Sequence, residues 1–363
     1  MRIVENGEEK DITAVWLEDK EQGIVKMIDQ RVLPWKLEYF VSDEWKRTAK
    51  AITNMVTRGA PNVGLTAAYA FYQASMDTLN DENFLPSLKA KAEEIKKARP
   101  TAVNLKNEVT RMFALTKQWI NNGLKEETVV EKLGNHAEKV AEREINANRR
   151  IGEFGADFIE DGDSMLTHCN AGALATVDYG TALAPVRVAT EQGKTVTVYA
   201  DETRPWLQGA RLTTWELQMS NIPCKLISDN AAGLLMRRGE IDLVITGTDR
   251  TALNGDVCNK IGTYKIALAA QDNDIPFYVA APLSSIDRDL DNGKDIPIEE
   301  RAAEEVTWVR GENEKGTIEK VRIAPQNTLV VNPVFDVTPN RLVTAIITEE
   351  GVFKPEELKH NLS

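Results

Sequence analysis

Apolar positions recur with helical spacing through most of the first 150 residues. Read with a period of three to four residues, they predict a series of amphipathic helices. The expected helices are Glu44–Thr57, Asn62–Met76, Leu88–Ala98, Ala102–Asn121 and Glu127–Phe154. Before them, short alternating stretches such as Thr13–Trp16 and Gly23–Met27 are typical of small strands. We therefore expect residues 1–150 to form a small strand region followed by a helical domain.

The pattern changes after residue 150. Short runs rich in β-branched and aromatic residues alternate with helical stretches, as in a parallel sheet covered by helices on both faces. Strands are expected in SMLTHC, TVTVYADE, CKLISD, DLVITGTD, PFYVAAP and TLVVNPVFDVTP. Helices are expected over Ala173–Gln192, Leu207–Ser220, Ala231–Arg238 and Lys260–Gln271. A polar stretch from Leu283 to Gln326 has little periodicity, and so long a loop is usually functional or mobile.

Length and charge narrow the class of protein. The 363 residues favour two domains or one large α/β unit. Forty-four basic and 56 acidic residues leave a formal charge of −12, which argues against a nucleic-acid or anionic-membrane binder. No apolar run approaches the roughly 18 residues of a membrane span, and the polar start does not look like a secretory signal. We expect a cytoplasmic protein without nucleic-acid or membrane partners.

The residues that commonly hold metals or cofactors are scarce. The three cysteines, Cys169, Cys224 and Cys258, are far apart and form no CxxC pair, so neither a disulfide framework nor a structural zinc site is expected. With only three histidines, a multi-histidine metal centre is not expected either. The GxGxxG and GxxxxGK[ST] fingerprints are absent. The sequence therefore supports neither a metal centre nor a nucleotide cofactor.

Polar residues follow three of the predicted strands. These are the segments His168–Asn170, Asp201–Arg204 and Thr248–Arg250. In an open parallel sheet, ligands bind beyond the carboxyl ends of the strands, so the three segments should meet at one edge. This convergence predicts a functional site there.

Cys169 is the most reactive residue type in these segments. It would precede a helix, whose free N–H groups and dipole favour a thiolate by lowering its pKa and also favour a bound anion such as phosphate. The alternative interpretation is that Cys169 packs in the core as a small apolar residue, since cysteine is among the most buried residue types. A catalytic pair with His168 stays open, but neighbouring residues in a strand point to opposite faces.

The segment Gly247–Tyr264 is dense in polar and glycine residues. Asp249 at the strand end is the candidate acid, Asp256 is its competitor, and a turn role is the alternative for both. Asn259 and Lys260 would start the next helix, where an anion would meet amides and an ammonium group.

Arginines next to predicted helix starts are candidates for phosphate binding. Arg58 in TRGAPNVG and Arg99 in ARPTAVN stand beside glycine or proline and could clamp a phosphate. The segment DETRPWLQGARL adds Arg204, Gln208 and Arg211. Capping and salt-bridge roles are the alternative reading for all of them.

Seven of these stretches together resemble the methylthioribose-1-phosphate isomerases. They are TRGAP (57–61), RPTAVN (99–104), THCNAGALAT (167–176), DETRPWLQGARLT (201–213), GTDRTALNGDVCNKIGTY (247–264), PFYVAAPLSSID (276–287) and NPVFDVTP (332–339). They cover most of the chain in the right order. The wider superfamily also holds ribose-1,5-bisphosphate isomerases, 5-deoxyribose-1-phosphate isomerases and regulatory subunits of a translation initiation factor's exchange complex.

The resemblance implies an α/β fold in which a mainly helical N-terminal domain (1–150) precedes a Rossmann-like domain (151–363) that carries most of the active site. It also implies a homodimer that converts 5-methylthioribose 1-phosphate to 5-methylthioribulose 1-phosphate in methionine salvage, without a metal or nucleotide cofactor. By motif, Cys169 and Asp249 are the catalytic residues. The substrate contacts implied are Arg58, Gly59, Ala60, Arg99, Gln208, Asn259 and Lys260.

The chemistry of this substrate suggests roles for the two catalytic residues. Its anomeric oxygen carries phosphate, so something must protonate the ring oxygen as the C1–O bond breaks. Asp249 is the expected general acid, which requires dry surroundings that raise its pKa. Cys169 is expected to act as the base at C2 or to stabilise the transition state. A hydride shift from C2 to C1 is the competing chemistry.

Three other functions stay open. The substrate could be 5-deoxyribose 1-phosphate, because a hydrophobic pocket separates such a pair weakly. Ribose 1,5-bisphosphate would need a second anion site that the sequence does not reveal. The chain could instead be a non-catalytic regulatory subunit of the initiation-factor type, but the intact thiol, acid and phosphate contacts argue against it.

Overall fold

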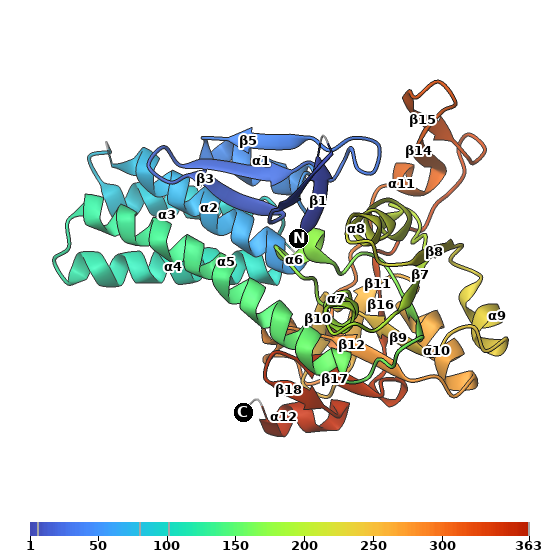
Figure 1. The fold of residues 1–363 in the computed structure, drawn as a ribbon. Helices are drawn as coiled ribbons and strands as arrows, with labels where there is room; N and C mark the ends of the chain where they lie inside the picture. The colour runs from blue at the N-terminus through green and yellow to red at the C-terminus, as the bar shows by residue number, and fades with distance from the viewer. Residues whose placement is uncertain (6, 80, 101, 362–363) are drawn as a thin grey trace.

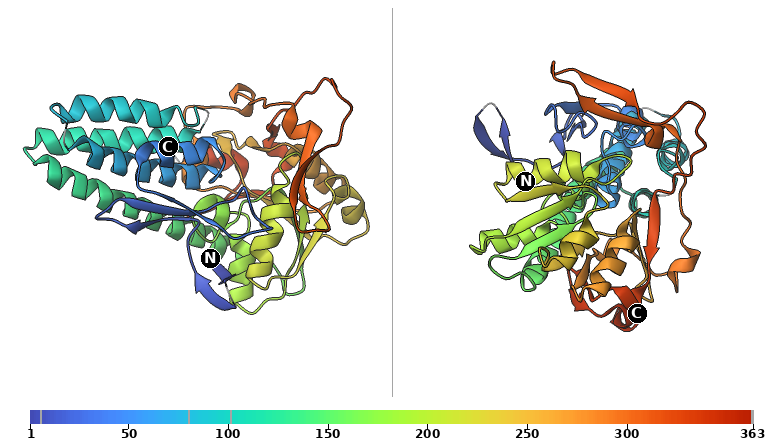
Figure 2. Two further views of the ribbon diagram at one scale, coloured as in Figure 1. Left: turned by 90° about the horizontal axis from the view of Figure 1, so that it is seen from above. Right: turned by 90° about the vertical axis from the view of Figure 1, so that its right-hand side faces the viewer.

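The computed structural model describes residues 1–5, 7–79, 81–100 and 102–361. A helical part and a part built on a parallel sheet lie side by side, and the long helix α5 (Glu126–Ala156) reaches from one to the other (Figure 1). The helices extend away from the sheet in one direction (Figure 2). Residue 150 falls inside α5, and the division into domains at that point stays a prediction.

Two small antiparallel sheets open the chain. The pair is β1 (Arg2–Glu5) with β2 (Glu8–Asp11). The three-stranded sheet is β3 (Val15–Asp19), β4 (Ile24–Ile28) and β5 (Tyr39–Ser42). The short alternating stretches that predicted strands before residue 40 correspond to β3 and β4.

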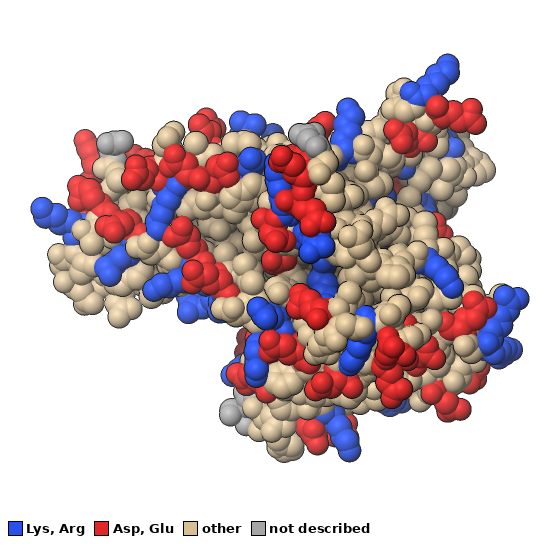
Figure 3. All heavy atoms as spheres, viewed as in Figure 1, with Lys and Arg blue, Asp and Glu red and all other residues tan. Residues whose placement is uncertain are grey.

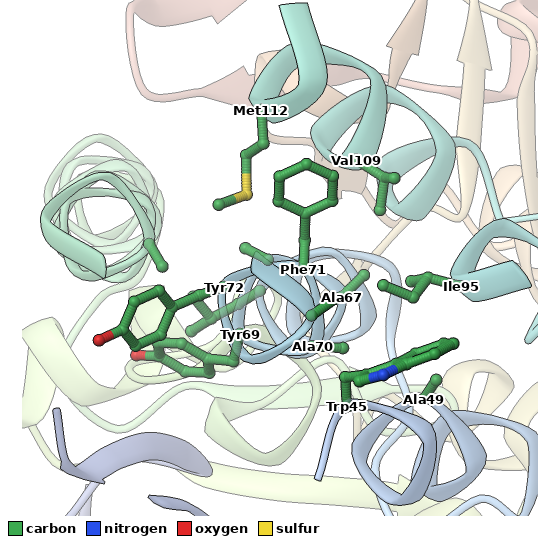
Figure 4. Packing of buried hydrophobic residues seen from close by; sticks show 14 of the residues in the cluster. Trp45, Ala49, Ala67, Tyr69, Ala70, Phe71, Tyr72, Ile95, Val109 and Met112 are labelled. Carbon is green, nitrogen blue, oxygen red and sulfur yellow. The ribbon is translucent and has the colours of Figure 1, made fainter. Parts of the chain in front are cut away.

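All five helices predicted in the first part are present, with shifted ends. They are α1 (Trp45–Thr53), α2 (Ala60–Thr78), α3 (Phe84–Lys96), α4 (Val103–Asn121) and α5. Sixteen of the nineteen residues of α2 are buried, because the other four helices and β3 surround it. Phe71 lies between Val109 and Met112 of α4 in this core (Figure 4). Burial of apolar side chains on α2 therefore holds the helical part together.

A seven-stranded sheet forms the second part, in the order β18-β17-β12-β9-β6-β7-β8. Its strands are β6 (Ser164–Thr167), β7 (Thr197–Asp201), β8 (Cys224–Ile227), β9 (Leu243–Thr246), β12 (Phe277–Ala280), β17 (Ala345–Thr348) and β18 (Gly351–Phe353). All neighbouring pairs are parallel except β17–β18. Numbered along the chain, the six parallel strands follow the Rossmann order 3-2-1-4-5-6. The predicted α/β fold with a Rossmann-like sheet is confirmed.

Helices cover both faces of this sheet. On one face, α5, α7 (Ala184–Glu191) and α8 (Thr214–Met219) pack on alternate strand residues such as Met165 and Ile245. On the other, α9 (Ala232–Arg237) and α10 (Thr263–Asp272) pack on the intervening residues such as Leu166 and Val244. A π-helical turn, Gly209–Thr213, leads into α8.

The helix predicted over Ala173–Gln192 is wrong as a single element. The structure has a four-residue helix α6 (Ala173–Thr176), a break, and then α7. Val177 and Tyr179 have positive φ in the break, and the carbonyls of Thr176 and Asp178 accept hydrogen bonds from Asn148 of α5. These tertiary bonds replace the helical bonds that the local pattern predicted.

The prediction that Asn259 and Lys260 start a helix is also wrong. They lie in strand β11 (Val257–Lys260), and α10 begins only after Gly262, whose φ is +105°. The strand β11 pairs with β10 (Arg250–Ala252) and with the late strand β16 (Phe335–Thr338). A partner almost 80 residues away along the chain therefore decides the local structure.

The polar stretch after Leu283 contains short elements. They include α11 (Glu304–Thr307) and a hairpin of β14 (Trp308–Glu312) and β15 (Ile318–Arg322) that projects from the molecule (Figure 1). The chain then returns to β16 and ends in α12 (Leu358–Asn361). Acidic and basic side chains are interspersed over the face drawn in Figure 3. Among the described helices, none has the length and apolar character needed to cross a membrane.

Candidate active site

A cavity of about 380 Å³ lies at the carboxyl edge of the sheet, lined by residues of both parts of the molecule. It lies beside the neighbouring strands β6 and β9, where the strand order of the sheet reverses direction. Ligands of open α/β sheets bind at this switch point. All nine predicted site residues line it: Arg58, Gly59, Ala60, Arg99, Cys169, Gln208, Asp249, Asn259 and Lys260.

Cys169 is held in an unusual backbone conformation directly after β6. Its φ is +65°, in the left-handed region that residues with a Cβ seldom adopt. Its N–H donates to the Thr203 hydroxyl at 2.9 Å, and its carbonyl accepts from the Thr213 hydroxyl at 2.7 Å. These two bonds stabilise a conformation that would otherwise be unfavourable.

The pKa of the Cys169 thiol is raised, whereas the sequence predicted that it would be lowered. Burial inside the cavity is the largest cause, and the positive charges of Arg58 and Lys260 only partly oppose it. The negative charge of Asp249 raises the pKa of the thiol further. Loss of hydration therefore outweighs the local electrostatics that the sequence suggested.

The start of α6 is not an anion site, which corrects a second expectation. The N–H groups of Ala173 and Leu174 donate to the buried carboxylate of Glu216, at 2.8 and 3.0 Å. The same carboxylate accepts from the Asn170 amide and pairs with Arg187 at 3.0 Å. The amides that would have met a phosphate are therefore already satisfied within the protein.

Asp249 follows β9 and lines the same cavity as Cys169. Burial raises the pKa of its carboxyl, while the charges of Lys260, Arg99 and Arg58 oppose the shift. Its competitor Asp256 lies in a turn, where it accepts from the backbone N–H groups of Gly293 and Asn340, both at 2.9 Å. The turn role thus holds for Asp256, and Asp249 alone of the two lines the cavity.

Of the six lysine and arginine residues that the structure describes along the cavity wall, three are predicted site residues, and two of these three are buried. The Arg58 guanidinium donates to the Asn170 carbonyl from both terminal nitrogens, at 3.0 Å each. Burial lowers the pKa of Lys260, while the charges of Cys169 and Asp249 favour its protonated form. Arg99 is the third. Together they make this cavity locally positive in a chain whose net charge is −12.

The beginning of α2 borders the cavity at Gly59 and Ala60. Gly59 has a φ of +87°, and a Cβ added to it would lie 2.2 Å from the Ala175 carbonyl oxygen. Only glycine allows this close approach between α2 and α6. The approach brings the first amides of a nineteen-residue helix next to Arg58.

Two buried polar atoms of the cavity residues have no hydrogen-bond partner among the described residues. They are Oε1 of Gln208 and Nε of Arg58. Buried polar atoms are rarely left unpaired, so these two are candidates for contacts to a ligand.

The two further arginines of the DETRPWLQGARL segment have structural roles. Arg211 is buried and donates to the carbonyls of Gln30, Arg31 and Leu33, which ties the N-terminal strands to the sheet. Arg204 donates to the Val306 carbonyl at 2.7 Å. Neither lines the cavity.

At the cavity wall, which His168 also lines, His168, Asp201 and Asp229 bring three candidate metal-ligand atoms within 4.8 Å of one another. Both His168 nitrogens already have hydrogen-bond partners, and both Asp229 oxygens accept backbone N–H groups, from Thr203 and Arg204. A metal ion would have to displace these bonds, so the group does not fit one.

Comparison with known proteins shows the family of this chain. A model of the Initiation factor 2 subunit family matches residues 56–355, and curated relatives match most of the chain. The chain belongs to this family. Within it, the chain belongs with the methylthioribose-1-phosphate isomerases, as the sequence motifs predicted.

Relatives of this family extend over nearly the full chain. The methylthioribose-1-phosphate isomerase of Thermotoga neapolitana is 51% identical over 91% of this chain and 92% of its own. A structure of 5-methylthioribose 1-phosphate isomerase from Pyrococcus horikoshii is 41% identical, with a TM-score of 0.86 over 97% of this chain and 95% of its own. A structure described as translation initiation factor eIF-2B subunit delta from A. fulgidus is also 41% identical, with a TM-score of 0.81 over 96% and 97%.

Several cavity residues escaped the sequence analysis. Ile296, Pro297, Glu299 and Arg301 come from the polar stretch, where no motif or periodicity marked them. Arg301 pairs with Glu305 at 2.7 Å and lies over the Trp206 ring. Glu216 does leave a signal in the sequence, since it is a lone acidic residue between the apolar residues Trp215 and Leu217.

Proposed function

We propose that the protein converts 5-methylthioribose 1-phosphate to 5-methylthioribulose 1-phosphate, a step of methionine salvage. The relatives named above support the reaction. The observation that carries the proposal is one cavity that holds a half-buried thiol, a half-buried carboxyl with a raised pKa and, among its described lining residues, six basic side chains. A sugar phosphate needs such a combination, because its phosphate requires positive charge and its ring requires an acid.

The cations bind the phosphate in this proposal. Arg58, Arg99 and Lys260 surround the anion, and the first amides of α2 at Gly59 and Ala60 donate to it. The unpaired Gln208 oxygen and the Asn259 amide contact the sugar hydroxyls. With the phosphate and sugar fixed, the C1–C2 bond lies between Cys169 and Asp249.

Asp249 opens the ring. Its raised pKa favours the protonated carboxyl, and in the proposed step that proton passes to the ring oxygen as the C1–O bond breaks and its electron pair moves to that oxygen. The resulting carboxylate later takes the proton from the C2 hydroxyl as the ketone forms. Asp249 therefore ends the cycle protonated, ready for the next substrate.

Cys169 handles the hydrogen at C2. As a thiolate it takes the C2 proton while the C1–C2 double bond forms, and it returns the proton to C1. Because the charge of Asp249 raises the pKa of the Cys169 thiol, a protonated Asp249 favours the thiolate, and the two groups hold one negative charge more easily than two. In the competing hydride shift, the hydrogen moves from C2 to C1 with its electrons, and the thiolate stabilises the cationic transition state.

The substituent at C5 needs an apolar surface. Met55, Val103, Ile296 and Pro297 line the cavity and supply one. Discrimination between methylthio and methyl in such a pocket is worth only about 1–3 kcal/mol. We therefore expect 5-deoxyribose 1-phosphate to be a poorer substrate rather than none.

We also propose that the protein works as a homodimer. Leu329 is 98% exposed and Val331 is 78% exposed, and Ile323, which precedes them by a few residues in the chain, is also exposed. Large apolar side chains exposed within one short segment favour an interface, and a second copy of this chain is the partner we expect. A molar mass of about one chain for the wild type in light scattering, or an unchanged dimer mass for Leu329→Asp/Val331→Asp, would refute this.

An isomerase assay on the purified protein, with no partner added, tests the function. Formation of the ketose from 5-methylthioribose 1-phosphate, with slower turnover of 5-deoxyribose 1-phosphate, is the expected result. The 41% identical structure described as an initiation-factor subunit makes a regulatory role the second candidate. Inactivity toward every 5-substituted ribose 1-phosphate, together with binding of a translation factor, would favour that role.

A further inference from the structure

The buried pair His168–Asp201 has no part in the reaction proposed above. His168 is 1% exposed and Asp201 is fully buried. The ring nitrogen Nδ1 lies 3.0 Å from Asp201 Oδ2, and Nε2 lies 2.9 Å from the Ile261 carbonyl oxygen. Since a carbonyl can only accept, Nε2 carries a hydrogen and donates it.

These contacts connect two residues that the function uses. His168 directly precedes Cys169 in the chain, and Ile261 directly follows Lys260. One imidazole ring therefore joins the loop after β6, which carries the thiol, to the turn after β11, which carries the ammonium group. Among the described residues, this is the side-chain hydrogen bond that joins the two segments, and the side chain that donates it is buried.

A closed ring of bonds also fixes the Cys169 backbone. The Cys169 N–H donates to the Thr203 hydroxyl, and that hydroxyl donates to the Asp201 carbonyl at 3.1 Å. The Asp201 carboxylate then returns to His168, whose peptide bond to Cys169 completes the ring. The strained φ of Cys169 lies inside this ring.

The surroundings leave the ring of bonds little room to move. A Cβ on Gly209 would lie 1.6 Å from the Asp201 carbonyl oxygen, and one on Gly262 would lie 3.1 Å from the His168 ring. Both glycines therefore pack directly on the pair. A well-packed polar network of this kind specifies a single geometry.

We propose that His168, Asp201 and Thr203 are positioning residues, which hold Cys169 in its left-handed conformation and fix its spacing to Lys260. The proposal rests on the proposed function for its kinetic test. The positioning role requires no contact between these residues and the substrate, and it gives a reason for a buried histidine–carboxylate pair immediately before Cys169 in the chain.

Paired variants separate positioning from simple stability. Thr203→Val removes the hydroxyl, whereas Thr203→Ser keeps it; Asp201→Leu removes the partner of His168, whereas Asp201→Asn can still donate to Nδ1. We expect Thr203→Val, Asp201→Leu and His168→Leu to lower kcat by about tenfold to hundredfold, with KM changed much less, because a misplacement near 1 Å has that effect. The conservative partners should restore most of kcat.

His136→Leu is the matched control. His136 forms a half-buried histidine–carboxylate contact with Glu108, at 3.0 Å in the helical part. We expect His136→Leu to lower the melting temperature and to leave kcat unchanged at temperatures below the melting range. An equal loss of kcat in His136→Leu and His168→Leu would overturn the positioning role.

A second measurement does not depend on isomerase activity. Alkylation of Cys169 by iodoacetamide, measured on its own peptide by mass spectrometry, reports the conformation of the loop, and Cys224 is the internal reference. We expect the rate at Cys169 to change in Thr203→Val and not in Thr203→Ser, while the rate at Cys224 stays constant. An unchanged Cys169 rate in every variant, or wild-type kcat in folded Thr203→Val, overturns the proposal; an inactive wild type refutes only the proposed function.

Discussion

The core around α2 is built mainly from apolar side chains, whereas the loops after β6 and β7 contain several buried polar side chains. Apolar side chains surround α2, and every one of its nineteen residues is helical. The loops after β6 and β7 bury polar groups, and five residues other than glycine have positive φ there. These are Cys169, Val177, Tyr179, Thr203 and Leu207.

This difference indicates what each region contributes. The α2 core lowers the free energy of the folded state through burial of apolar surface. The loops hold strained backbone and buried charge, which are unfavourable by themselves and persist because the surrounding structure fixes them. We therefore expect substitutions in the first region to affect stability and substitutions in the second to affect turnover.

The largest effect is expected in the α2 core. Phe71→Ala removes a fully buried ring and should lower the free energy of unfolding by about 3–5 kcal/mol. Denaturant unfolding measures the loss, and Phe71→Leu should lose less. The kcat of the fraction that stays folded should be unchanged, and a kcat defect there would break the comparison between the two regions.

Substitution of the catalytic pair should have the converse effect. Cys169→Ser and Asp249→Asn should each lower kcat by at least about a hundredfold, equivalent to about 2.7 kcal/mol, with little change in melting temperature. Steady-state kinetics and thermal unfolding on the same samples measure both quantities. Cys224→Ser is the control cysteine, and a variant of either catalytic residue with near-wild-type turnover would remove that residue from the mechanism.

Gly59 lies where the two regions meet, so its replacement should affect both. Gly59→Ala places a Cβ against the Ala175 carbonyl and should cost about 2 kcal/mol of stability while raising KM. Gly123→Ala is the matched control, because Gly123 has a similar φ of +82° with no atom within 4 Å of the added Cβ. Equal KM values in the two variants would show that the α2 start does not contribute to substrate binding.

The smallest effect is a shift in the pH dependence of Cys169. The charge of Asp249 raises the pKa of the thiol, so Asp249→Asn should lower that pKa. The charge of Lys260 lowers it, so Lys260→Met should raise it. The rate of Cys169 alkylation against pH should therefore shift to lower pH in the first variant and to higher pH in the second. Shifts in the same direction would contradict the electrostatic arrangement of the cavity.

The sequence predicted most of the secondary structure and the set of residues in the cavity. The five N-terminal helices follow from apolar spacing, and the parallel strands follow from short β-rich runs. The nine site residues were placed together through strand ends and family motifs, and they do line one cavity. Their catalytic and binding roles stay predictions.

The errors share a cause. Ala173–Gln192 looked like one helix, but Asn148 of α5 binds the carbonyls at its break. Asn259 and Lys260 looked like a helix start, but β16 pairs with them. In both cases a partner distant in the chain satisfies the backbone and overrides the local pattern.

What the sequence by itself determined is therefore local: the periodicity of apolar residues, the strand ends and the identity of the polar residues that follow them. The tertiary structure decided the direction of the Cys169 pKa shift and the partner of the α6 amides. Hydration of the thiol depends on residues from both parts of the molecule, and Glu216 reaches α6 from more than 40 residues away. Desolvation and long-range pairing depend on distances in space, which the order of residues along the chain does not contain.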